Sequence, residues 1–300
     1  MDSNFKNERR KVIKRISVSS AGLYLSPSVQ LNTTSNKKPI KQINMKRKIN
    51  HSVCKWCFSQ IPLEEFAMNV KAIGITGIDL IGPKDWDILK KNGLTSSMCN
   101  GAEISLTEGW NDKQYHSTLV DNYIKHIDMV ANAGFKNLIC FSGNRRDIDD
   151  ETGLINCEVG LKKILSHAEK KGVIIQMELL NSKVDHEDYM CDNSNWGFEL
   201  CQRINSDNFK LLYDIYHMQI SEGDIIRTIS KNYHFIGHYH TAGVPGRNEI
   251  DQTQELFYPA IMKAILSTGF EGFVAQEFIP KGPNPITVSY THLRAHETRS

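Results

Sequence analysis

Short apolar runs alternate with helical segments between residues 49 and 277, and no other feature constrains the fold as strongly. Eight runs are predicted strands: Ile49–Val53, Gly77–Ile81, Leu94–Cys99, Asn137–Phe141, Val173–Leu179, Lys210–Asp214, His234–His240 and Gly272–Glu277. Seven segments are predicted helices: Leu63–Ile73, Trp86–Asn92, Leu119–Ala133, Cys157–Lys171, Trp196–Ile204, Asp224–Lys231 and Glu255–Ser267. This alternation predicts a (β/α)8 TIM barrel. A doubly wound sheet is the alternative, but no glycine-rich phosphate loop follows the first strand.

Four of the predicted strands end on a side chain that can bind a metal ion. These side chains are Glu178, Asp214, His240 and Glu277, spaced at intervals of 36, 26 and 37 residues. Because a TIM barrel forms its active site at the carboxyl ends of its strands, we expect the four to converge there. Three carboxylates and one imidazole suit a divalent cation such as Mg²⁺ or Mn²⁺. Buried ion pairs are the alternative interpretation.

Four segments around these residues resemble a known family. Residues Met177–Met190, Leu211–Gly223, Gly237–Ile250 and Val274–Gly282 are similar to hydroxypyruvate isomerases, sugar isomerases and epimerases with a xylose-isomerase-like TIM barrel. The resemblance covers about residues 49–285. It implies that the glutamates matching Glu178 and Glu277 are both metal ligands and the catalytic acid and base. In this family the third metal ligand is Gln or His, and His240 is at the matching position.

Other polar residues near the strand ends are candidate substrate ligands. His217, three residues after Asp214, is predicted to bind a substrate oxygen, or else to orient a neighbouring group. Arg247 is predicted to bind a substrate carboxylate with two hydrogen bonds, although a solvated loop arginine is the alternative. Asn144 and Arg145, after the fourth strand, are a second candidate anion site. His238 is expected to face away from His240, as a packed histidine.

The favoured function is a metal-dependent isomerase that interconverts hydroxypyruvate and tartronate semialdehyde (2-hydroxy-3-oxopropanoate) through an enediolate. The alternative is a ketose 3-epimerase or another sugar isomerase, with a small hydroxy-carbonyl acid or sugar as substrate in every case. Two further alternatives are an endonuclease-IV-like hydrolase and a non-catalytic sugar-acid binding protein. Nucleic-acid binding is disfavoured because residues 49–300 carry a formal net charge of −8, against +2 for the whole chain. A homo-oligomer is left open, and no run is long enough to span a membrane.

The two ends of the chain differ in composition from the predicted domain, residues 49–287. Residues 1–48 have a net charge of +10, and Glu8–Lys14 resembles a twin-arginine export motif. We therefore expect a signal segment and a periplasmic protein; a disordered tail and a cytoplasmic protein are the alternative. Residues 288–300 read as the in-frame translation of a transposase-type sequencing adapter, so the last helix of the barrel is expected to be missing. The seven cysteines, including the pair Cys54 and Cys57, lack the spacing of a disulfide framework.

Overall fold

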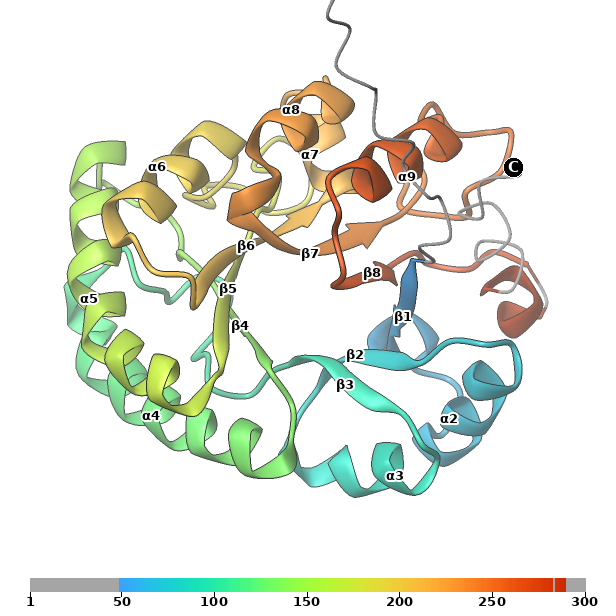
Figure 1. Ribbon diagram of the computed structural model, residues 1–300. Coiled ribbons are helices and arrows are strands. Elements are labelled where there is room, and N and C mark those ends of the chain that lie inside the picture. Colours follow the sequence, from blue (N-terminus) through green and yellow to red (C-terminus); the bar gives the residue numbers. More distant parts are fainter. Residues whose placement is uncertain (1–48, 283, 290–300) are drawn as a thin grey trace, which may run out of the picture. The chain divides into compact units, whose positions relative to one another are not determined.

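The computed structural model describes residues 49–282 and 284–289, and these residues form a closed parallel barrel. Its strands are β1 (Asn50–Cys54), β2 (Gly77–Ile81), β3 (Thr95–Cys99), β4 (Asn137–Cys140), β5 (Ile174–Glu178), β6 (Phe209–Asp214), β7 (Ile236–Thr241) and β8 (Phe273–Gln276). Each strand pairs with the next along the chain, and β1 pairs with β8 to close the ring (Figure 1). The predicted TIM barrel is confirmed, and every strand boundary lies within two residues of its predicted place.

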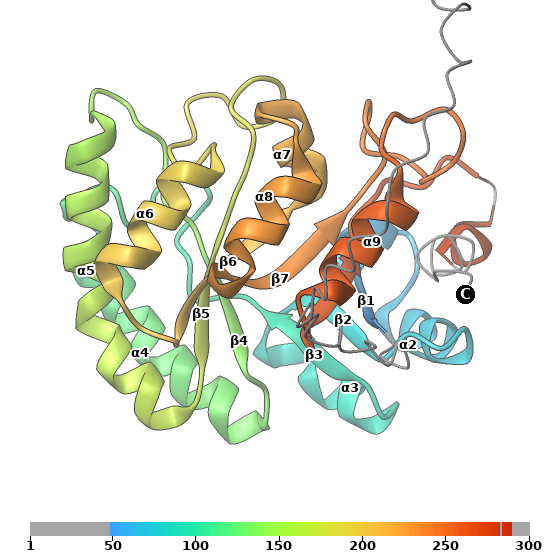
Figure 2. The ribbon, with the colours of Figure 1, turned by 45° about the horizontal axis from the view of Figure 1, so that its top comes forward.

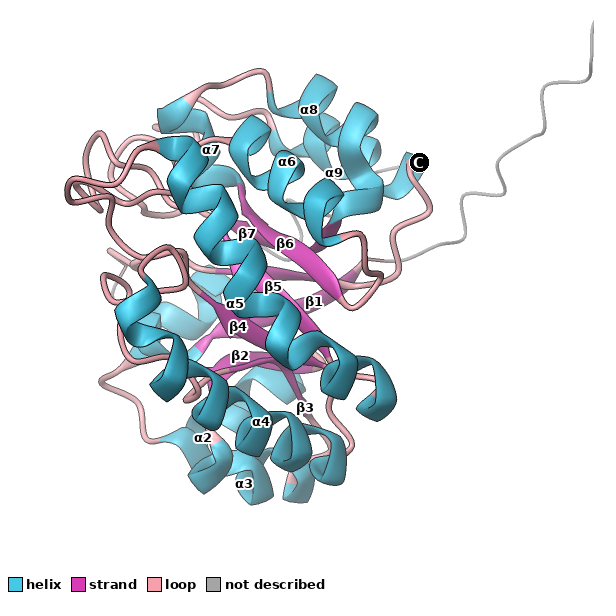
Figure 3. Cartoon of the chain, turned by 90° about the vertical axis from the view of Figure 1, so that its left-hand side faces the viewer, coloured by secondary structure: helices cyan, strands magenta, loops and turns pink. Residues whose placement is uncertain are grey.

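Helices surround the strands. They are α2 (Leu63–Ala72), α3 (Trp86–Lys91), α4 (His116–Ala133), α5 (Asp150–Lys171), α6 (Ser194–Ile204), α7 (Ile215–Ser221), α8 (Ile225–Asn232) and α9 (Tyr258–Ser267). Figure 2 shows α4, α5 and α6 in sequence around the outside of β4, β5 and β6. The buried residues of these helices are mostly apolar. Long loops gather at one end of the barrel (pink in Figure 3).

Two helices differ from the sequence prediction for local reasons. Helix α5 begins seven residues earlier than predicted, because the Asp149 side chain accepts a hydrogen bond from the Thr152 backbone N–H and caps the first turn. Helix α7 was not predicted. It begins at Ile215, directly after β6, so the final residue of the strand, Asp214, is also the helix cap.

The carboxyl-terminal part of the described chain packs against β8. Residues 285–289 form a helical turn, and the buried Ser289 hydroxyl donates a hydrogen bond of 2.6 Å to Gln276 Oε1. The predicted non-native origin of residues 288–300 stays a prediction, and residues 290–300 lie outside the described part. The predicted leader, residues 1–48, also lies outside it. Among the described residues, no helix is both long and apolar enough to cross a membrane.

Candidate metal and substrate site

The four predicted metal ligands lie together at the carboxyl ends of β5 to β8. The strand register places Asp214 beside His240, while Glu178 ends β5 and Glu277 follows β8 directly. Their ligand atoms lie within 4.8 Å of one another, and all four side chains are buried. The structure thus brings together the side chains that the sequence analysis singled out. Their binding of an ion stays a prediction.

Asp214 is oriented by the helix that it caps. Its Oδ1 atom accepts hydrogen bonds from the backbone N–H groups of Tyr216 (2.8 Å) and His217 (3.3 Å). These bonds hold the first turn of α7 and leave Oδ2 directed toward the cluster, 3.4 Å from Arg247 Nη2. One oxygen therefore fixes the local backbone, and the other is available to a ligand.

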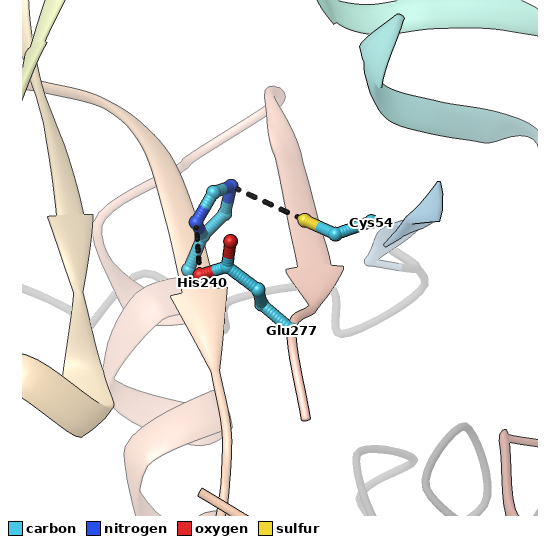
Figure 4. A group of neighbouring side chains, drawn as sticks. All are labelled: Cys54, His240 and Glu277. Atoms are coloured by element: carbon cyan, nitrogen blue, oxygen red, sulfur yellow. Dashed lines mark hydrogen bonds and ion pairs between the residues drawn. The ribbon is translucent and has the colours of Figure 1, made fainter. Parts of the chain in front are cut away.

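Glu277 makes hydrogen bonds through both carboxylate oxygens. Oε1 accepts one from the Trp56 indole N–H (2.7 Å), and Oε2 accepts from Arg247 Nη2 (2.5 Å) and lies 2.9 Å from His240 Nδ1. Figure 4 shows the Glu277 carboxylate beside the His240 ring. Glu178 differs, because its buried Oε1 accepts no hydrogen bond from any described residue, although it lies 3.1 Å from His240 Nδ1.

The buried charges shift the pKa values of these groups in opposite directions. Burial would raise the pKa of Glu277, but the Arg247 guanidinium and the His240 imidazole outweigh it and hold this pKa well below its usual range. Burial raises the pKa of Asp214 well above its usual range, and the negative charge of Glu277 adds to this effect. Burial would lower the pKa of His240, but Glu277 raises it well above 6.5. The cluster therefore favours added positive charge.

His217 is held as a neutral hydrogen-bond donor. The orientation of the Asn181 amide is fixed, because its oxygen accepts from the backbone N–H groups of Val184 (2.9 Å) and Asp185 (3.1 Å). Its nitrogen therefore donates to His217 Nδ1 at 2.6 Å, which leaves the proton of the imidazole on Nε2. That Nε2 atom is buried and has no hydrogen-bond partner among the described residues. Burial and the charge of Arg247 keep the pKa of His217 well below 6.5.

Arg247 lies across the cluster on a tight turn of the loop after β7. Its backbone adopts φ +56°, which is uncommon for a residue other than glycine. The guanidinium carbon lies 5.2 Å from the ring centres of both Trp56 and Tyr216, so the aromatic rings hold it over the carboxylates. The alternative of a solvated loop arginine does not hold, because this side chain is 13% exposed. Arg247 makes its hydrogen bonds through Nε and Nη2, and Nη1 makes none with any described residue.

Asn144 and Arg145 have structural contacts instead of a place in the cluster. The five N–H groups of Arg145 bond to Asp150, Asp192 and the backbone oxygens of Tyr189 and Met190. The Asn144 amide donates to the Glu187 carbonyl at 3.2 Å. Both side chains join the loop after β4 to the loop after β5. A substrate anion would have to displace these bonds, so the geometry lends no support to their predicted role, which stays untested.

The expected orientation of His238 is wrong. Residues two positions apart on a strand face the same side, so His238 points into the barrel as His240 does. His238 Nε2 lies 2.5 Å and His240 Nε2 3.1 Å from the same oxygen, Asp79 Oδ2. The sequence analysis missed Asp79. A single carboxylate within the apolar run Ile78-Asp79-Leu80 was the signal that could have revealed it.

Several observations agree with a divalent cation at the cluster of Glu178, Asp214, His240 and Glu277. The donors are hard oxygens and one imidazole, the combination that Mg²⁺ and Mn²⁺ accept. Glu178 Oε1 is buried without a hydrogen bond, and such an atom normally has a partner. The raised pKa of Asp214 also indicates that positive charge is deficient at this point. The four side chains therefore fit a divalent cation.

Comparison with known families agrees with the barrel. A family model described as "Xylose isomerase-like TIM barrel" matches residues 68–295. The chain belongs to this family. Two solved structures share the fold: an L-ribulose 3-epimerase, with a TM-score of 0.68 at 17% identity over 83% of this chain and 93% of that one, and a family 2 AP endonuclease from Brucella melitensis, with a TM-score of 0.67 at 23% identity over 78% and 95%.

Relatives within this xylose isomerase-like family bear isomerase names. The 2-oxo-tetronate isomerase of Cupriavidus necator is 32% identical over 38% of this chain, and the "Putative hydroxypyruvate isomerase" of Homo sapiens is 31% identical over 39%. These two matches span 43% and 44% of the relatives' own lengths, less than half. The 2-oxo-tetronate isomerase of Pectobacterium atrosepticum is 25% identical over 75% of this chain and 89% of its own length. The resemblance to the hydroxypyruvate isomerases is confirmed.

Proposed function

We propose that this chain is a metal-dependent isomerase that moves a carbonyl group between adjacent carbons of a small hydroxy-carbonyl acid. The favoured reaction interconverts hydroxypyruvate and 2-hydroxy-3-oxopropanoate. The observation that carries the proposal is the buried cluster of Glu178, Asp214, His240 and Glu277, whose ligand atoms lie within 4.8 Å of one another. The isomerase names of the relatives support the same reaction class.

The two glutamates provide a route for the proton. One takes a proton from C3 of hydroxypyruvate, and the electron pair forms the C2–C3 double bond of an enediolate. The other returns a proton to C2, while the hydroxyl proton on O3 is lost and O2 gains one, which leaves the carbonyl at C3. Either glutamate can serve as the base, because both carboxylates lie in the same buried cluster. The protons lost from C3 and O3 are balanced by those gained at C2 and O2, so the product is an isomer of the substrate.

Three other features position the substrate. His217 would donate its Nε2–H to a substrate oxygen, because Asn181 occupies its other nitrogen and Nε2, 3.6 Å from Asp214 Oδ2, makes no hydrogen bond with a described residue. Arg247 would bind the substrate carboxylate through Nη1, which bonds to no described residue, and this favours an acid over a neutral sugar. A divalent cation held by Glu178, Asp214, His240 and Glu277 would polarise the substrate carbonyl and stabilise the negative charge that develops on its oxygen.

The test is a turnover assay of the purified full chain, stripped with a chelator and then supplied with Mg²⁺ or Mn²⁺. We expect hydroxypyruvate or a 2-oxo-tetronate to be isomerised only with the added ion, and product formed in D2O to carry deuterium at C2. Turnover of ketohexoses but not of keto acids would replace this proposal with the 3-epimerase. Saturable binding of the acid without turnover would make the chain a binding protein.

A further inference from the structure

A second group of buried polar side chains lies beneath the candidate metal site, inside the barrel. Asp79 on β2 is fully buried, and its neighbours are His238 and His240 on β7 and Ser97 on β3. Ser97 donates a short hydrogen bond to Asp79 Oδ1. Gly77 makes room for that hydroxyl, since a Cβ atom at this position would lie 2.5 Å from Ser97 Oγ. None of these four residues has a part in the proton transfers described above.

The two ring nitrogens of His240 face different groups. Nδ1 faces the site: it lies 2.9 Å from Glu277 Oε2 and 3.1 Å from Glu178 Oε1. Nε2 faces the barrel interior: it lies 3.1 Å from Asp79 Oδ2 and 3.8 Å from Cys54 Sγ. Figure 4 shows the Cys54 and Glu277 side chains on opposite nitrogens of the ring. A metal ion at the site can therefore be bound only through Nδ1.

We infer that Asp79 is a positioning residue that fixes the proton of His240 on Nε2 and so presents the Nδ1 lone pair to the metal ion. Asp79 Oδ1 accepts from Ser97, and Asp79 Oδ2 lies 2.5 Å from His238 Nε2 and 3.1 Å from His240 Nε2. When Nδ1 of His240 gives its lone pair to a metal ion, the ring keeps its proton on Nε2, where Asp79 Oδ2 is placed to accept it. This inference rests on the metal site of the proposed function.

His238 shares this oxygen and strengthens the arrangement. Its Nε2 atom lies 2.5 Å from Asp79 Oδ2. His238 contacts the carboxylate from a position two residues before His240 on the same strand. Its Nδ1 is buried without a hydrogen-bond partner among the described residues, so Nε2 makes the hydrogen-bond contact of this ring. Ligand atoms of Asp79, His238 and His240 also lie within 4.8 Å of one another, so an inner metal site is the competing interpretation. Their mutual hydrogen bonds favour the positioning role.

The direct test is a spectroscopic one on the wild-type chain. Protein labelled with ¹⁵N at histidine and loaded with diamagnetic Mg²⁺ is examined by long-range ¹H–¹⁵N correlation, with His238→Gln and His240→Gln used for assignment. We expect both rings to be protonated on Nε2, with His240 Nδ1 unprotonated. A proton on His240 Nδ1 in the loaded protein would overturn the inference, and this result needs no Asp79 variant that folds.

The second test measures Mn²⁺ affinity by calorimetry. Asp79→Asn removes the charge and makes one terminal atom a donor, and loss of such a partner weakens metal binding by about 10–100-fold. Ser97→Ala and Cys54→Ala are the matched controls, because each alters the same buried group but leaves the Asp79 carboxylate, and both should bind Mn²⁺ as the wild type does. Wild-type affinity in Asp79→Asn, or two ions per chain, would refute the role of Asp79. A wild-type chain that binds no divalent ion would instead refute the proposed function.

Discussion

Replacing each glutamate of the site by glutamine should have equal effects on turnover and unequal effects on stability. Glu277→Gln and Glu178→Gln both remove a carboxylate that can exchange a proton, so each should lower kcat by about 10²–10⁴-fold. The hydrogen bonds differ, however. Glu277 accepts from Trp56 on one oxygen and from Arg247 on the other, whereas Glu178 Oε1 accepts none from the described residues.

The loss of stability expected for Glu277→Gln follows from these contacts. The amide can accept on one side only, so one donor faces an NH2 group, and Arg247 loses its nearest negative charge. Breaking a buried ion pair costs about 3–5 kcal/mol. The lower end applies because Asp214 Oδ2 stays 3.4 Å from Arg247. For a domain of this size about 3 kcal/mol lowers Tm by about 6–12 °C. Glu178→Gln removes the charge 3.1 Å from His240 Nδ1 but leaves Glu277 beside that nitrogen, and it loses no described hydrogen bond at Oε1, so its stability should change by about 1 kcal/mol or less.

The assay is thermal unfolding of both variants in a chelator, together with kcat and Mn²⁺ affinity after reconstitution. Glutamine keeps a carbonyl oxygen, so much of the metal affinity should survive in both. Equal Tm values would mean that the Glu277 contacts do not form as described. Near-normal turnover in both variants would rule out proton transfer by the glutamates and point to a different base.

Three further predictions concern neighbouring groups. Asp214→Ala removes the cap of α7 and should lower the free energy of unfolding by about 0.5–2 kcal/mol, and excess Mn²⁺ should partly restore its turnover. Asp214→Asn keeps the capping oxygen and should melt near the wild-type Tm. Arg247→Met should lower the stability of the chelator-treated chain by about 3–5 kcal/mol and that of the Mn²⁺-saturated chain by less. Calorimetry should therefore show that the variant binds Mn²⁺ more tightly than the wild type. Equal losses of stability with and without Mn²⁺ would contradict the idea that the arginine and the ion neutralise the same carboxylates. Burial lowers the pKa of His116, whose Nε2 lies 2.9 Å from the Trp110 carbonyl oxygen. As the pH falls, this histidine therefore binds a proton in the unfolded chain before it does so in the folded chain. The free energy of unfolding should accordingly fall as the pH drops below about 6.5. His116→Gln keeps a donor but cannot titrate, and an unchanged pH slope in that variant would refute the assignment.

The ligand set could be predicted because it depends on features that stay local in the sequence. An apolar run that ends on Glu178 or Asp214 marks both a strand and its carboxyl end. A closed parallel barrel then brings all such ends to one rim, whatever the packing details. Four positions separated by about 100 residues in total could therefore be placed together without knowledge of a single tertiary contact.

The other polar contacts could not be predicted because they join residues distant in sequence. Asp79 and His238 are separated by 159 positions, and nothing near either residue specifies the other. The proton position on His217 depends on the Asn181 amide, which is fixed in turn by a loop turn after β5. Arg145 was a reasonable anion ligand by charge, but its partners on the neighbouring loop become visible only in the folded chain.

The direct joining of β6 to α7 divides the site into a fixed and an exchangeable part. With no linker between strand and helix, Asp214 and His217 belong to one continuous stretch of backbone and cannot shift independently. Asn181 and Arg247, by contrast, lie on the loops of residues 179–193 and 242–257, outside the strands and helices. Substrate range should therefore be altered most readily by exchanging these two loops with those of relatives. Libraries that vary the β6–α7 junction should yield mostly inactive protein.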